Sequence, residues 1–172
     1  MRKTIAFLAS GAAATMIVGG VGLASASARP ASARPASSAV SGTEHFSLMT
    51  TQPTAARYTI IATGVFTAGG TDISGNKTDL VKLPGGTFKV HHGGRFRIVK
   101  EQLNKQTCLA VFEARANLTI GGGTGKYKGI SGSGTALISQ TFIARRSHGA
   151  CNPNLTPSVS EQTITAKAHV HL

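Results

Sequence analysis

The chain has 172 residues, and its 18 Lys and Arg residues outnumber its 6 Asp and Glu residues, which gives a formal net charge of +12 at pH 7. It contains no Trp and only two Tyr and seven Phe, too few to supply the aromatic platforms that bind single-stranded nucleic acid. Acidic residues are few and no Ser-His-Asp order stands out, so hydrolase chemistry is weakly supported. We expect neither a nucleic acid partner nor a cofactor.

The N-terminus has the three-part pattern of a secretory signal peptide. Arg2 and Lys3 precede an uncharged, apolar run over residues 4–23, and small residues follow up to Ala28. A membrane anchor is the alternative, since about 20 apolar residues can span a bilayer. Against it, glycines interrupt the run and no basic stop-transfer cluster follows it directly. The sequence predicts a signal peptide over residues 1–28, and therefore a secreted, extracellular protein that is not integral to the membrane after cleavage.

A short repeat separates the signal peptide from the rest of the chain. The sequence Ala-Arg-Pro-Ala-Ser occurs at residues 28–32 and again at residues 33–37. Such a tract cannot bury enough apolar surface to fold, so residues 29–42 are predicted to be a disordered linker and residues 43–172 the folded domain. Loss of Arg2 and Lys3 leaves 16 basic and 6 acidic residues, a charge of about +10 that favours attraction to anionic polymers of the cell envelope. The basic residues are scattered rather than gathered in one run.

Two cysteines, Cys108 and Cys151, lie in the exported part of the chain. In an oxidising compartment an isolated pair most simply forms one disulfide bond. A nucleophilic cysteine is the sharper alternative, but no pattern of partner residues supports it.

The folded domain shows the alternation of half-buried strands and almost no helical periodicity. The alternation is clearest over residues 109–120 and 163–172. Further strand candidates are residues 44–49, 58–67, 79–83, 86–92, 96–103 and 134–144. Glycine-rich turns, including Gly69-Gly70, separate them, and short connections imply antiparallel neighbours. About eight such strands tend to close, because closure removes exposed edges. The predicted fold is an all-β, eight-stranded antiparallel barrel.

The most distinctive segment is the glycine-rich stretch at residues 121–134. Its spacing fits neither a Walker loop, because Ile120 stands where the first glycine is needed, nor a dinucleotide-binding motif. Glycines that permit positive φ values in a tight connection between long strands explain it better. The motif resembles the strand-connecting motif of the allene oxide cyclase and dirigent β-barrel superfamily. The residues that carry this resemblance are Gly122, Gly123, Thr124, Gly125, Tyr127, Gly129 and Gly132.

The resemblance implies a calycin-like, eight-stranded antiparallel barrel with a central apolar cavity. The family includes plant cyclases, proteins that direct the stereochemistry of coupling reactions, and many secreted bacterial proteins. The motif glycines carry over as fold determinants, and no catalytic position carries over, so the catalytic residues are unknown.

The apolar strand faces predict which side chains line such a cavity. The candidates are Tyr58, Ile60, Phe66, Phe88, His92, Phe112, Gln140 and Phe142. This lining suits a small, mostly apolar molecule held by a few polar contacts. A barrel filled by its own side chains is the alternative.

His169 and His171 are weak candidates for a metal site. Residues two apart on a strand share a face, so both imidazoles could reach one ion, whereas solvated histidines near the chain end are the alternative. Our leading hypothesis is a secreted barrel that binds a small apolar ligand without covalent catalysis. An isomerase or cyclase of the same shape and a basic module that binds envelope polyanions are the other two hypotheses.

Overall fold

The structure, a computed structural model, describes residues 40–52, 56–93 and 95–172. The predicted signal peptide and almost all of the predicted linker lie outside the described residues. The first strand begins at Ser41, two residues before the expected start of the domain at Thr43. The strands are β1 (Ser41–Thr50), β2 (Arg57–Thr63), β3 (Ala68–Ile73), β4 (Thr78–Leu83), β5 (Gly86–His91), β6 (Arg97–Leu103), β7 (Leu109–Gly121), β8 (Ser131–Ile143), β9 (Arg145–Ser147), β10 (Ala150–Asn152) and β11 (Val159–His171). In this part of the chain, no helix has the length and apolar character needed to cross a membrane.

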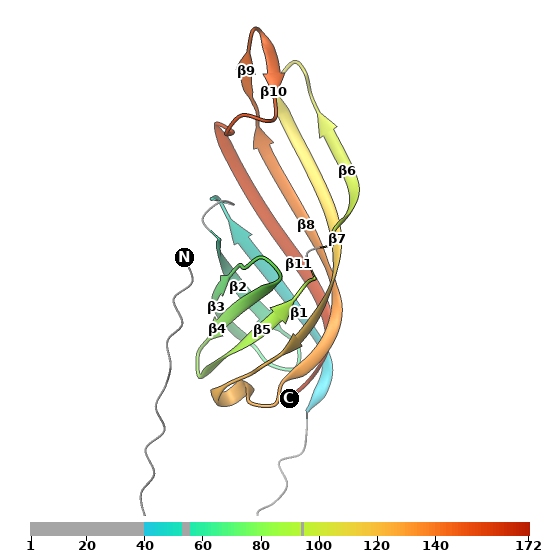
Figure 1. Cartoon of the computed structure of the whole chain (residues 1–172). Helices are drawn as coiled ribbons and strands as arrows, with labels where there is room; N and C mark the ends of the chain where they lie inside the picture. The colour runs from blue at the N-terminus through green and yellow to red at the C-terminus, as the bar shows by residue number, and fades with distance from the viewer. Residues whose placement is uncertain (1–39, 53–55, 94) are drawn as a thin grey trace, which may run out of the picture. The chain divides into compact units, whose positions relative to one another are not determined.

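Eight of these strands form a closed barrel, so the predicted eight-stranded antiparallel barrel is confirmed (Figure 1). The order around the barrel is β5-β4-β3-β2-β1-β11-β8-β7, and every neighbouring pair is antiparallel. A short pairing between β5 and β7 closes it, in which Val90 lies opposite Ile120. Closure leaves the barrel without a free edge.

Two expectations about individual strands are wrong. One barrel strand was not expected and one expected barrel strand lies outside the barrel, so the total of eight barrel strands is unchanged. Residues 69–70 were expected to form a turn, but they lie inside β3, which pairs with both β2 and β4. Pairing on both sides satisfies the backbone hydrogen-bonding groups of this glycine-containing segment. This tertiary context outweighs the weak local preference of the two glycines for a turn. Residues 96–103 were expected in the barrel, but β6 pairs only with the first part of β7. The barrel has no room for β6 because β5 takes the other end of the same edge of β7.

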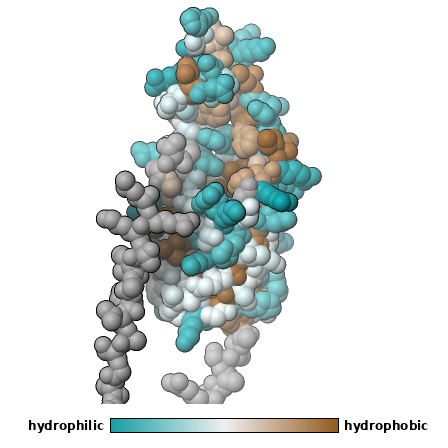
Figure 2. All heavy atoms as spheres, in the orientation of Figure 1, coloured by the Kyte–Doolittle hydropathy of each residue, from teal (hydrophilic) through white to brown (hydrophobic). Residues whose placement is uncertain are grey.

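Three long strands continue past the barrel. β7, β8 and β11 have 13 residues each, whereas β2 has seven and β3, β4 and β5 have six. Their far halves, together with β6, form an open sheet that we call the extension, and the hairpin of β9 and β10 lies at its tip (Figure 1). The space-filling view shows hydrophilic and intermediate residues mixed over the visible face of the domain, with hydrophobic side chains exposed between them (Figure 2).

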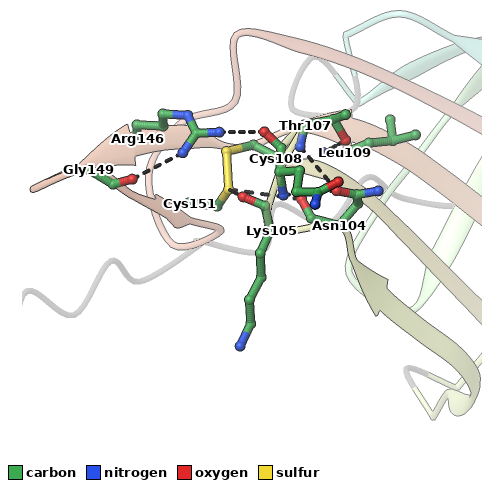
Figure 3. The surroundings of a disulfide bond; sticks show 9 residues. Asn104, Lys105, Thr107, Cys108, Leu109, Arg146, Gly149 and Cys151 are labelled. Atoms are coloured by element: carbon green, nitrogen blue, oxygen red, sulfur yellow. Dashed lines mark hydrogen bonds between the residues drawn. A yellow bond between two sulfur atoms is a disulfide. The ribbon is translucent and has the colours of Figure 1, made fainter.

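A disulfide bond ties the tip of the extension together, as predicted (Figure 3). The S–S distance between Cys108 and Cys151 is 2.05 Å, and their Cα atoms are 5.3 Å apart. Beside it, the guanidinium group of Arg146 donates hydrogen bonds to the carbonyl oxygens of Gln106 and Gly149. The bridge therefore joins the start of β7 to the β9–β10 hairpin.

The end of the barrel away from the extension is filled. The glycine-rich segment folds back there, and the short 3-10 helix η2 (Gly125–Tyr127) follows its first glycines. The amide of Lys126 donates a hydrogen bond to the carbonyl oxygen of Gly85, and Gly125 has a φ of 58°, which glycine adopts without strain. The ring of Tyr127 packs against Phe66 and Phe88, with centroid distances of 5.1 and 5.6 Å. Aromatic side chains therefore fill this end of the barrel.

Candidate functional site

The other half of the barrel encloses a cavity of about 280 Å³. Its wall is mainly apolar and includes Leu48, Ile60, Val81 and Leu118. Gly75 and Asn76, which line it at one end, are exposed, so the cavity reaches the surface at the turn between β3 and β4.

The cavity exists because small side chains meet in one row of the sheet. Ala116 on β7 lies opposite Ala136 on β8, which in turn lies opposite Ala166 on β11. All three line the cavity, and we call them the alanine row. A methyl group fills far less of a barrel interior than the side chains of Ile138 and Ile164 in the next row toward the extension, so the strand register leaves space at the alanine row.

Polar side chains gather at the open end of the cavity, and we call them the polar rim. Antiparallel strands bring the starts of some strands and the ends of others to the same end of a barrel. Tyr58, Asp79 and Gln162 lie near the starts of β2, β4 and β11. Asp72 lies near the end of β3, and His92 directly follows β5. The polar rim consists of Tyr58, Asp72, Asp79, His92 and Gln162.

Hydrogen bonds connect most of the polar rim. The hydroxyl group of Tyr58 donates to the Oε1 atom of Gln162 at 2.8 Å. The Oδ1 atom of Asp79 accepts a hydrogen bond from the amide of Gly75 at 2.9 Å and lies 3.3 Å from the Nε2 atom of His92. These side chains are therefore held in place before any ligand enters.

Asp72 differs from the other members of the polar rim. Only 2 % of its surface is exposed, it lines the cavity, and its carboxyl group takes part in none of the hydrogen bonds found among the described residues. Burial, and secondarily the negative charge of Asp79, raises the pKa of Asp72 from 3.8 to about 7. Burial and the charges of both aspartates also raise the pKa of the Tyr58 hydroxyl group. A carboxyl group with this pKa can donate or accept a proton near neutral pH.

The charge of the cavity is opposite in sign to that of the chain. No Lys or Arg is found among the described residues that line it, whereas Asp72 and Asp79 are the only aspartates in the sequence. The whole chain has a net charge of +12. The cavity is therefore an acidic, mainly apolar site in a basic protein.

The structure distributes the predicted lining residues over three regions. Tyr58, Ile60 and His92 line the cavity. Phe66 and Phe88 belong instead to the aromatic cluster at the filled end, where their ring centroids are 6.3 Å apart. The remaining three, Phe112, Gln140 and Phe142, lie on the parts of β7 and β8 that belong to the extension.

Sequence reasoning missed three members of the polar rim. Gln162 precedes the predicted last strand, and it shares the inward parity of Ile164, so extending the alternation by two residues would have found it. Asp72 and Asp79 flank the turn between β3 and β4. Asp72 lies in a strand without clear alternation, so no local signal marks it as inward-facing.

The two weak metal candidates lie on the outside of the barrel. The rings of His169 and His171 are exposed, with centroids 4.9 Å apart. In the described ranges, no group of three or more His, Cys, Asp or Glu side chains is placed to hold a metal ion.

A second, shallower hollow of about 240 Å³ also lies on the outer face of the barrel. It crosses β1, β11, β8 and β7, and its lining includes His45, Lys167, Thr135 and Arg115. The basic side chains give this hollow a charge opposite to that of the cavity.

Comparisons of the chain with protein families, with curated proteins and with solved structures find no match.

Proposed function

We propose that this protein is a secreted barrel that binds a small, mostly apolar molecule in its cavity without covalent catalysis. The observation that carries the proposal is the cavity of about 280 Å³, with its apolar wall and its polar rim at one end. Small-molecule sites usually combine an apolar wall with a few fixed polar groups. The signal-peptide pattern, the disulfide bond and the resemblance to the allene oxide cyclase and dirigent superfamily support the proposal.

The size of the cavity argues against a simple packing defect. Protein interiors are close-packed, and few of their voids are larger than one water molecule. A void that holds one water needs only about 10–15 Å³ on the same kind of measure. The alanine row keeps a much larger space open, at the expense of apolar contacts that larger side chains would make.

Filling the cavity tests this proposal. Native mass spectrometry of protein secreted by its own host is expected to show a co-purifying apolar molecule. Ala136→Phe places a ring in the alanine row and should abolish that signal, whereas Thr135→Phe, on the exposed face of the same strand, should keep it. Circular dichroism would confirm that both variants fold. An empty wild-type barrel, or a ligand retained by a folded Ala136→Phe variant, would contradict the proposal.

A second candidate function is proton-transfer catalysis in the same cavity, as an isomerase or cyclase. The specific observation in its favour is Asp72, whose pKa of about 7 suits a general acid or base. Its carboxylate would take a proton from one atom of the substrate and return it to another, with no covalent intermediate. Incubation of the co-purified molecule in heavy water should then show deuterium uptake with the wild type and none with Asp72→Asn. Equal uptake would exclude Asp72 as the proton carrier.

A third candidate, binding of anionic envelope polymers, is favoured by the basic hollow on the outer face. Arg115 and Lys167 both line it. Exposed ion pairs are largely screened at about 0.5 M salt, which removes attraction by net charge. Specific binding in the hollow should persist in part at that salt concentration, and it should weaken when both residues are replaced with Gln. Complete loss of binding in salt would indicate attraction by net charge alone.

A further inference from the structure

Around Asp72 and Tyr58 the polar rim offers hydrogen-bond acceptors to a ligand, and the amide nitrogen of Gln162 is its donor group. The Tyr58 hydroxyl group directs its hydrogen toward Gln162, which leaves the phenolic oxygen as an acceptor. Asp72 lines the cavity, only 2 % of the surface of the residue is exposed, and no hydrogen bond to its carboxyl group is found among the described residues. A buried polar group without a partner costs free energy, so a ligand that supplies a donor at Asp72 is favoured over one that does not.

The charges around Asp72 select for a positive donor. Asp79 lies on the neighbouring strand, where its Oδ1 atom accepts a hydrogen bond from the amide of Gly75 and lies 3.3 Å from the Nε2 atom of His92. No such contact to the carboxyl group of Asp72 is found among the described residues. The described lining contains no Lys or Arg that could accept a carboxylate ligand. A cation beside Asp72 would favour its ionised form and relieve its repulsion with Asp79, whereas an anion would add to that repulsion.

We propose that the cavity binds a small apolar amine, with its ammonium group on Asp72 in the polar rim and its apolar body against the alanine row. This inference rests on the proposed ligand-binding function and names the chemical class of the ligand. It assigns Asp72 as the residue that determines specificity, and it excludes fatty acids and other carboxylates as the preferred ligands.

A matched series of ligands separates this inference from the general binding function. Phenylbutylamine, phenylbutanol and phenylbutyrate share one apolar body and differ in the head group, and isothermal titration calorimetry at neutral pH would give their affinities for the full mature domain. We expect the amine to bind at least about tenfold more tightly than the alcohol, since a hydrogen bond to a charged group is worth more than one between neutral groups. The carboxylate should bind more weakly than the alcohol.

Two variants with the same change in charge locate the effect. Asp72→Asn should bring the affinities for the amine and the alcohol together without weakening the alcohol. Glu161→Gln removes one carboxylate from an exposed position outside the cavity and should leave the preference for the amine unchanged. The ligand series on the wild type alone tests the preference if Asp72→Asn does not fold.

The outcomes are distinguishable. Equal binding of amine and alcohol, or tighter binding of the carboxylate, would overturn the amine assignment while leaving the cavity as a binding site. Failure of all three molecules to bind would count against both the assignment and the proposed function. Equal loss of preference in the Glu161→Gln variant would show that net charge, and not Asp72, governs the selection.

Discussion

The hydroxyl group of Tyr58 donates a 2.8 Å hydrogen bond to the Oε1 atom of Gln162, which lies 104 residues later in the chain. Tyr58 stands on β2 and Gln162 on β11, and β1 runs between them in the sheet. The contact therefore spans two strand pairings across the open end of the barrel. It holds the polar rim in place and directs the Tyr58 proton away from Asp72.

Removal of this hydroxyl group should weaken the fold modestly. Tyr58→Phe leaves a partly buried amide oxygen without its donor, and we expect a loss of about 1 kcal/mol in the free energy of unfolding, measured with urea. Tyr127→Phe is the matched control, because the Tyr127 hydroxyl group makes no hydrogen bond among the described residues. A similar loss in both variants would show that the bond to Gln162 contributes nothing specific.

The carboxyl group of Asp72 should make stability depend on pH. Its pKa is 3.8 when exposed and about 7 in the folded state, so between these values the folded protein binds more protons than the unfolded chain. Stability should fall as pH rises from about 4 to about 7, by roughly 4 kcal/mol at most, and then level off. The pKa of Glu44 is also raised by burial, but Glu44 is present in both the wild type and Asp72→Asn and cancels in their difference. A pH-independent difference between these two proteins in urea unfolding would contradict the raised pKa of Asp72.

The disulfide bond should stabilise the domain without shaping the cavity. Cys108 and Cys151 are separated by 43 residues, and closing such a loop is worth about 4 kcal/mol in the chain-entropy model. Guanidinium unfolding with and without a reducing agent should differ by an amount of that order. Ligand affinity in native conditions should not change, because neither cysteine lines the cavity. A reduced protein that binds more weakly would indicate that the extension takes part in binding.

Gly125 should tolerate no side chain at the filled end of the barrel. A Cβ atom there would lie 2.0 Å from the carbonyl oxygen of Gly85, and the φ of Gly125 is 58°. Gly122 has a similar φ of 63°, but a Cβ atom there would meet only the side chain of Lys89, at 3.4 Å. Each Ala substitution should cost about 1–2 kcal/mol for the left-handed backbone, and Gly125→Ala should cost more because of the backbone clash. Thermal unfolding of the two variants measures the difference, and equal losses would argue against the clash.

Strands with a strong alternating pattern were predictable and strands without one were not. β7 and β11 show the alternation because one face of each packs inward along most of its length. β3 has the sequence Ala-Gly-Gly-Thr-Asp-Ile, in which turn-forming residues outweigh any alternation, so only its pairing with β2 and β4 makes it a strand. For β6 the pattern indicated a strand correctly, but no local property could show that it pairs outside the barrel.

The candidate site was only partly accessible from the sequence. Tyr58, Ile60 and His92 were selected by their parity on inward faces, and they do line the cavity. The same parity also selected Phe88, which lies at the filled end of the barrel, and Phe112, which lies in the extension. Parity identifies the face of a strand on which a residue lies, but not its level along the barrel.

The sequence by itself determined the all-β class, a barrel of about eight strands and the pairing of Cys108 with Cys151, because alternation, turn chemistry and cysteine count are local or compositional properties. Which eight strands close the barrel was decided by long-range pairing, which includes β3 and leaves β6 outside. Only the tertiary structure decided that the alanine row lies at one level and that Asp72 faces it unpaired. These facts depend on the register of strands that are far apart in the chain. A shift of one residue in any of them would turn the site outward, and no local pattern specifies that register.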